Sequence, residues 1–208
     1  DAERALLRRL SVFAGGFSLE AVEAVCSEQL TVNSQQSAAH CSPFTVHCSL
    51  LDLLTSLIDK SLVVVETRGN ATRYNMLETV RQYAREKLLE ANEAEIYARR
   101  HRDWFLQFAE DAAPKLRGRE QLEWCERLDL EIENLRAALT WSLEQTDHDS
   151  AESALRLAGA LGWFWLLRGY WDEARTWLER SLENRVITPA RAMPLVGLAL
   201  MEYYAGAP

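Results

Sequence analysis

The residues with the greatest potential for chemistry are histidines and cysteines in the first quarter of the chain. His40-Cys41 and His47-Cys48 are two dipeptides seven residues apart, and Cys26 precedes them. Thiolates and imidazoles bind zinc, but structural zinc sites use pairs of ligands separated by about two to four residues. The spacing here does not match that pattern, and no C-x-x-C pair occurs. We therefore expect no metal site, and we expect the thiols to be reduced.

Catalytic motifs are also missing from the sequence. Neither G-x-S-x-G nor H-E-x-x-H occurs, and there is no G-x-x-x-x-G-K-[ST] loop that would bind phosphates. Glu131 and Glu133 are neighbouring carboxylates, but two positions apart on a helix they lie on different faces. We expect no enzymatic activity, no catalytic residue and no cofactor bound by this chain.

The charge and the apolar content of the chain argue against nucleic acids and membranes as its partners. The net charge of −8 disfavours a broad nucleic-acid-binding surface, which needs clustered Lys and Arg. No segment approaches the roughly 20 apolar residues of a membrane span, and residues 1–10 do not form a signal peptide. We expect a cytoplasmic protein that does not contact membranes. The missing initial Met and the incomplete repeat at the end lead us to expect a piece of something larger.

The most informative pattern is an alternation of small and large residues over 158–182. Small residues occur where two antiparallel helices would touch, and Gly169 occurs where the chain would turn. This spacing resembles a tetratricopeptide (TPR) hairpin, a unit of about 34 residues whose stacked copies bind other proteins. It favours a protein-binding scaffold. The signature positions are Leu161, Gly162, Trp165, Gly169, Trp171, Ala174, Leu178 and Ser181.

Two more tryptophans and one more helix belong to this region. Trp163 and Trp177 are not on the small-residue positions. Either they pack within the hairpin, or one of them lines the concave surface where a partner binds. Residues 195–204 read as the first helix of a second repeat, because Gly197 follows Gly162 by 35 positions.

The first part of the chain predicts a different domain. Helical periodicity or β-branched composition marks helices over 4–13, 18–26, 50–58 and 78–91 and strands over 61–65 and 72–76. Three helices followed by a β-hairpin are typical of a winged-helix domain. We predict a mainly α fold with a winged-helix-like domain over 1–91, polar insertion 27–48, a helical segment over 92–150, and a TPR repeat with an incomplete second repeat over 151–208.

Residues 92–150 look helical throughout. Buried stripes predict helices over 96–112 and 120–144, joined by Pro114 and Gly118 and followed by a polar connector over 146–150. The basic run Arg99-Arg100-His101-Arg102 is expected to form a solvated face or to pair with Glu93 and Glu95.

Four stretches together carry a family resemblance. They are Leu10-Ser-Val-Phe-Ala-Gly-Gly-Phe-Ser-Leu-Glu-Ala, Leu51-Asp-Leu-Leu-Thr-Ser-Leu-Ile-Asp-Lys-Ser-Leu-Val, Tyr74-Asn-Met-Leu-Glu-Thr-Val-Arg-Gln-Tyr-Ala and Glu133-Asn-Leu-Arg-Ala-Ala-Leu. The chain resembles bacterial STAND regulators, which are signal-transduction ATPases with numerous domains. The resemblance implies an upstream nucleotide-binding domain that holds ATP or ADP, and a protein or small-molecule inducer that binds the TPR repeats.

The resemblance breaks down at one functional position. In related switch ATPases a Met-His-Asp motif ends the winged-helix hairpin, and its His reaches the bound ADP. The matching residues here are Met76, Leu77 and Glu78, and Leu cannot donate a hydrogen bond to a phosphate. Either another contact replaces the His or nucleotide sensing at this point is absent. The simpler reading makes Met76 and Leu77 core residues and Glu78 a helix-start residue.

A winged helix also raises the alternative of a DNA-binding regulator that uses residues 50–60 as its recognition helix. Asp52 and Asp59 oppose the single Lys60 in that segment. Direct DNA binding by this chain is therefore not expected, and packing against a neighbouring domain is favoured.

Overall fold

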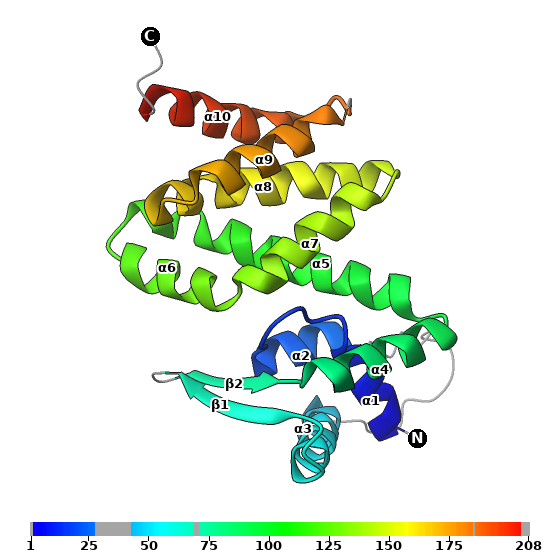
Figure 1. Cartoon of the computed structure of the whole chain (residues 1–208). Helices are drawn as coiled ribbons and strands as arrows, with labels where there is room; N and C mark the ends of the chain where they lie inside the picture. Colours follow the sequence, from blue (N-terminus) through cyan, green and yellow to red (C-terminus); the bar gives the residue numbers. More distant parts are fainter. Residues whose placement is uncertain (1, 28–42, 69–70, 185, 205–208) are drawn as a thin grey trace. The chain divides into compact units, whose positions relative to one another are not determined.

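The structure, a computed structural model, describes residues 2–27, 43–68, 71–184 and 186–204. These residues are mainly helical, with one two-stranded antiparallel sheet (Figure 1). The chain divides into two compact units, Asp1–His101 and Arg102–Pro208. The boundary falls inside helix α5 (Ala94–Ala112), which begins in the first unit and ends in the second.

The first unit is built around helix α1 (Ala2–Leu10), which packs against the other helices of the unit. Those helices are α2 (Leu19–Cys26), α3 (Pro43–Asp59) and α4 (Glu78–Glu90), and the hairpin strands are β1 (Val64–Arg68) and β2 (Ala71–Asn75). Apolar side chains repeat along each helix at helical spacing and meet in one core. Its fully buried members include Leu10, Phe13, Phe17, Val22, Leu54 and Leu57.

The hairpin is tied to the segment between α1 and α2. Strand β1 pairs with β2 from Val64↔Asn75 to Arg68↔Ala71. On its other edge, β2 forms an isolated antiparallel bridge in which Phe17 N donates to Tyr74 O at 2.8 Å and Tyr74 N donates to Phe17 O at 2.9 Å. The order of helices, hairpin and following helix agrees with the order predicted from the sequence.

Two expected boundaries in this unit are wrong. Residues 43–48 were expected to be part of the polar insertion, but they form the start of α3. Proline suits the first position of a helix because its φ is preset and its missing N–H has no helical partner there. The first strand begins at Val64 instead of Ser61, since Ser61 adopts a left-handed conformation with φ 58° that closes the end of α3. The rest of the insertion, 28–42, lies outside the described residues.

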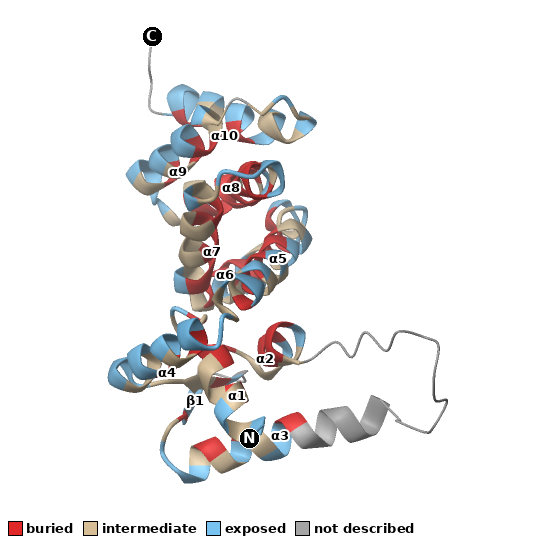
Figure 2. Ribbon diagram, turned by 90° about the vertical axis from the view of Figure 1, so that its right-hand side faces the viewer, coloured by how far each residue is buried: buried red, intermediate tan, exposed pale blue. Residues whose placement is uncertain are grey.

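The second unit is helical throughout the residues that the structure describes. After the end of α5 come a short 3₁₀ turn η1 (Lys115–Arg117), α6 (Gln121–Leu130), α7 (Ile132–Glu144), α8 (His148–Arg168), α9 (Trp171–Glu183), a second turn η2 (Pro189–Arg191) and α10 (Ala192–Tyr204). Helix α8 packs against α7, α9 and α10. Most of α8 is therefore buried, whereas α9 and α10 carry many exposed residues (Figure 2).

The single helix expected over 120–144 is instead two helices. The helix is interrupted at Glu131, where φ is −104° and ψ is 6°. The Glu131 carboxylate is buried and accepts a hydrogen bond from Asn134 Nδ2 at 2.9 Å. Leu122 is an apolar residue of this predicted amphipathic segment, but it is exposed and does not lie on the buried stripe. The polar connector is also shorter than expected, because Asp147 caps α8 by accepting from Ser150 N at 3.0 Å.

The basic run of α5 is only partly a solvated face. Arg99 pairs with Glu95 at 3.6 Å, as expected. His101 and Arg102 are instead buried. Arg102 Nη2 lies 2.9 Å from Asp149 Oδ2, which satisfies its charge inside the second unit.

No helix among the described ranges combines the length and the hydropathy needed to cross a lipid bilayer.

Candidate interaction sites

The turn of the predicted TPR hairpin lies at Gly169. Its φ of 76° is left-handed, a conformation that glycine adopts without steric cost. Gly169 N donates to Leu166 O at 3.3 Å and Tyr170 N donates to Trp165 O at 3.0 Å, so the last carbonyls of α8 are satisfied. Helices α8 and α9 therefore form the helical hairpin that the glycine spacing predicts.

The signature residues gather where α8 and α9 meet, with one exception. The buried ones are Leu161, Gly162, Trp165, Ala174, Leu178 and Ser181. The Ser181 hydroxyl donates to Leu178 O at 2.8 Å, which lets a polar side chain sit in this interface. Trp171 remains 37% exposed and lines a shallow cavity with Met201 and Tyr204 of α10.

Helix α10 approaches α8 and α9 closely through glycines. A β-carbon on Gly159 would lie 2.6 Å from Met193 Cβ, and one on Gly197 would lie 3.1 Å from Leu178 Cδ1. A β-carbon on Gly162 would meet only Gly197 Cα, at 4.0 Å. The tightest contact is thus at Gly159, which is not one of the signature positions of the TPR-like pattern.

Trp163 and Trp177 have different surroundings. Trp163 is half-buried and lines a cavity of about 180 Å³ between α8 and α10, with Arg117 5.3 Å from the centre of its ring. Trp177 Nε1 donates to Glu173 Oε1 at 3.1 Å, so this indole is part of a charged network. The expectation that one of the two lines a partner-binding surface stays a prediction.

That network joins α7 to α9. Arg136 Nε and Nη2 donate to the two carboxylate oxygens of Glu173 at 2.7 and 2.6 Å, and Arg136 Nη1 donates to Glu133 Oε1 at 2.7 Å. These charge-assisted bonds raise the pKa of Arg136 above its ordinary value and lower the pKa of Glu173. Sequence reasoning missed this pair, because its members are 37 positions apart.

The junction of β2 and α4 contains Met76, Leu77 and Glu78. Leu77 is 57% exposed and precedes α4 without a side-chain cap, so its expected place in the core is wrong. Met76 is half-buried. Glu78 begins α4, as expected, and accepts two hydrogen bonds from Arg81 at 2.8 and 2.7 Å, which lower the pKa of Glu78.

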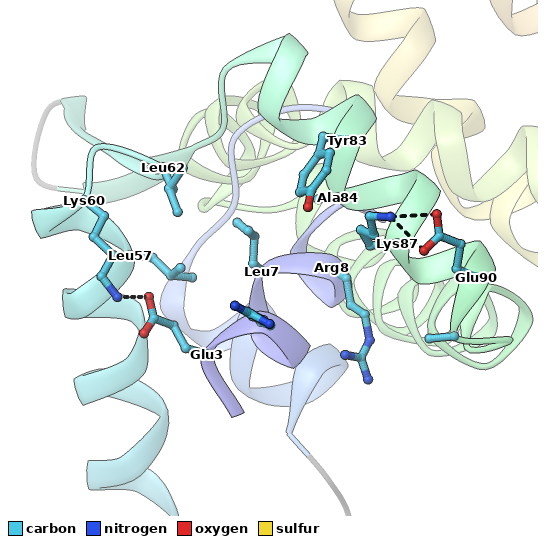
Figure 3. A pocket seen from close by; sticks show the side chains of 12 residues that line it. Glu3, Leu7, Arg8, Leu57, Lys60, Leu62, Tyr83, Ala84, Lys87 and Glu90 are labelled. Atoms are coloured by element: carbon cyan, nitrogen blue, oxygen red, sulfur yellow. Dashed lines mark hydrogen bonds and ion pairs between the residues drawn. The ribbon is translucent and has the colours of Figure 1, made fainter. Parts of the chain in front are cut away.

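A cavity of about 790 Å³ opens between α1, α3 and α4, and we call it the α1–α3–α4 pocket. Figure 3 shows Leu7 in its middle, with one ion pair, Lys60 with Glu3, at one end and another, Lys87 with Glu90 at 2.7 Å, at the other. No sequence pattern indicated this pocket, because its residues come from three separate segments.

The helix expected to contact DNA in the alternative reading has an acidic exposed face. Asp52 and Asp59 are exposed on α3, and the adjacent Lys60 pairs with Glu3. Arg73 on β2 is buried and donates to Gly16 O at 2.6 Å, so its side chain stabilises the fold and does not face solvent.

The cysteines that the structure describes with their side chains are buried. Cys26 and Cys125 carry free thiols, and burial raises the pKa of Cys26 to about 12. No cluster of three or more His, Cys, Asp or Glu side chains with metal-binding geometry occurs within the described segments. His40 and Cys41 lie outside them.

Sequence comparison links the chain to mycobacterial proteins. A protein of Mycobacterium tuberculosis named "Putative HTH-type transcriptional regulator" is 38% identical over 208 residues, which cover 97% of this chain. A protein of the same name from Mycobacterium bovis matches equally well. The chain is a homologue of these proteins. It spans 21% of their length, so the similarity concerns one segment of each.

A further relative is an uncharacterized protein of Mycobacterium tuberculosis, 40% identical over 100 residues, which cover 48% of this chain and 22% of that protein. No family model matches the chain. No solved structure matches it.

Proposed function

We propose that this chain is a regulatory and protein-interaction segment of a transcriptional regulator of the STAND type. In this proposal the first unit is a winged-helix domain that docks against an upstream nucleotide-binding domain. The second unit begins a TPR arm that receives a protein or small-molecule inducer. Nucleotide state and inducer binding then bias the regulator between closed and open arrangements.

The observation that carries the proposal is the close stacking of α8, α9 and α10. Gly169, with a left-handed φ, forms the turn between α8 and α9. Helix α10 packs on both helices, with little space at Gly159 and Gly197. Helical hairpins stacked in this manner bury a continuous core and present extended surfaces to partners. Exposed apolar side chains on α10 supply such a surface: Met193, Leu195, Val196, Tyr203 and Tyr204.

Two features of the first unit support its assignment as a winged helix. Three helices precede the β-hairpin, and the Phe17–Tyr74 bridge adds the segment between α1 and α2 to the edge of the hairpin. Leu77 occupies the position of the nucleotide-contacting His and is exposed. An exposed leucine is suited to an apolar contact with a neighbouring domain.

The proposal assigns all nucleotide contacts to a domain outside this chain. Isothermal titration of the chain with ATP and with ADP, in the presence of Mg²⁺, is expected to give no binding heat. Dissociation constants in the micromolar range for either nucleotide would overturn that assignment.

One observation favours a second candidate function. The mycobacterial relatives carry "HTH-type transcriptional regulator" in their names, and a DNA-reading winged helix would fit that name. The acidic exposed face of α3 and the burial of Arg73 weigh against reading DNA through this unit. In our proposal the DNA-binding part of the regulator lies elsewhere.

A further inference from the structure

We propose that the cavity between α8 and α10 binds a small carboxylic acid with one compact apolar body, of the size of benzoate. We call it the Arg117 cavity, because Arg117 of η1 is the single charged residue among the described residues that line it. This site deepens the proposed function, because it names a class of inducer for the second unit, and its regulatory role rests on that function.

The volume of the cavity sets the size of the ligand. It is about 180 Å³, below the range of about 300–1,000 Å³ that is usual for pockets that hold drug-sized ligands. An apolar cavity of about 150 Å³ is large enough to take up benzene. One six-membered ring or a branched aliphatic group of similar volume therefore fits, and a second ring does not.

The lining of the cavity is apolar apart from Arg117. Leu166 and Leu200 contribute aliphatic surface, and the half-buried ring of Trp163 contributes aromatic surface. Space remains beside Gly162, where the nearest atom that a β-carbon would meet is Gly197 Cα at 4.0 Å. An aromatic ring or a branched aliphatic group would bury its own apolar area against these side chains.

Arg117 selects a carboxylate. Its guanidinium lies 5.3 Å from the centre of the Trp163 ring. Within the described segments its side chain forms no ion pair and no hydrogen bond, and no Asp or Glu is among the described residues that line the cavity. A guanidinium binds a carboxylate through two parallel N–H···O bonds, and an indole beside it limits its movement. The charge of a bound acid would therefore meet a cation that has no other anion to satisfy it.

The test compares benzoate with benzamide, which has the same ring and a neutral amide in place of the acid. Titration followed by amide chemical shifts gives the affinity and the location of each compound. We expect benzoate to shift the signals of Arg117, Trp163 and Val196, with a dissociation constant on the order of 1 mM. Benzamide should bind about fivefold more weakly, because it lacks the charge that pairs with the guanidinium.

Two variants separate the charge from the apolar body. Arg117→Gln should weaken benzoate binding about fivefold and leave benzamide binding unchanged. Ala160→Leu, which adds volume at a lining position of α8, should weaken both. The control is Arg119→Gln, which removes an exposed cation that is not among the lining residues and should leave both affinities within about twofold.

Thermal melting shows that each variant is folded. An unchanged benzoate affinity in folded Arg117→Gln, equal affinities for benzoate and benzamide, or shifts confined to residues outside the cavity would overturn the proposed site. Such a result would leave the proposed function standing, since nucleotide titration and DNA binding test that function without either compound.

Discussion

A β-carbon built on Gly159 of α8 would lie 2.6 Å from the β-carbon of Met193 in α10, closer than two such atoms come in real proteins. The backbone of α8 and the first turn of α10 can therefore pack as they do only because position 159 has no side chain. Gly162, one turn further along α8, has more space. The two glycines provide a matched pair for testing how α10 is held.

Gly159→Ala is expected to destabilise the second unit by about 1–3 kcal/mol, because Met193 or the backbone of α10 must move. Gly162→Ala should change stability by at most about 1 kcal/mol, and toward greater stability, since alanine favours helix and its methyl group fits. Urea unfolding followed by circular dichroism measures both. Equal effects of the two substitutions would show that α10 does not pack on Gly159.

The Arg136–Glu173 pair predicts a dependence on pH. Glu173→Gln should lower the free energy of unfolding by about 1 kcal/mol at neutral pH, a value reduced for the partial exposure of both side chains. The pKa of Glu173 is lowered in the folded state. Its contribution is therefore present above the ordinary value of 4.5 and is lost as the pH falls through the lower folded-state value.

The measurement is the free energy of unfolding from pH 7 to pH 3, and the two proteins should converge at the acid end. Glu179→Gln is the control, because Glu179 lies on the same helix and forms an exposed pair with Arg175 at 3.7 Å. A difference between wild type and Glu173→Gln that grows as the pH falls would contradict the assignment.

Local chemistry explains which parts of the fold could be predicted. The turn at Gly169 and the β-hairpin follow from glycine conformation and from β-branched composition, which act over a few residues. The break at Glu131 could not be predicted, because no glycine or proline marks it and a buried hydrogen bond to Asn134 stabilises it. The start of α3 was not predicted, because the polar composition of 27–48 as a whole and Pro43 within it are typical of a loop.

The candidate sites could likewise be predicted only where they depend on residues close together in the sequence. The sequence identified the buried faces of α8 and α9, because helical spacing sets which residues share a face. It could not identify the Arg136–Glu173 pair or the α1–α3–α4 pocket, since both depend on how distant segments pack. Leu77 was misassigned because an apolar residue beside a strand end can face either the core or solvent.

Leu77→Ala should change the stability of the chain by less than about 0.5 kcal/mol, because the side chain is mostly exposed. Leu57→Ala, at a fully buried position, should cost about 2–5 kcal/mol. Urea unfolding of the two variants checks this. A loss of unfolding free energy in Leu77→Ala similar to that in Leu57→Ala would show that Leu77 lies in the core and is not available for contact with another domain.

Cys26 should resist alkylation. At pH 8 a thiol with a pKa of about 12 is ionised in roughly one molecule in ten thousand, and burial blocks the reagent as well. Iodoacetamide labelling followed by mass spectrometry of the Cys26 peptide should give modification only after denaturation. Rapid labelling of the native protein would show that α2 opens readily or that the thiol is exposed.

The central claim is that this chain serves its regulator through contacts with proteins or inducers and does not itself read DNA. Fluorescence anisotropy against a random duplex pool at low salt, followed by sequencing of the bound fraction, tests this most directly. We predict no enriched sequence and no dissociation constant below about 10 µM. Enrichment of one sequence that is lost in Lys60→Gln and retained in Arg85→Gln would contradict the account.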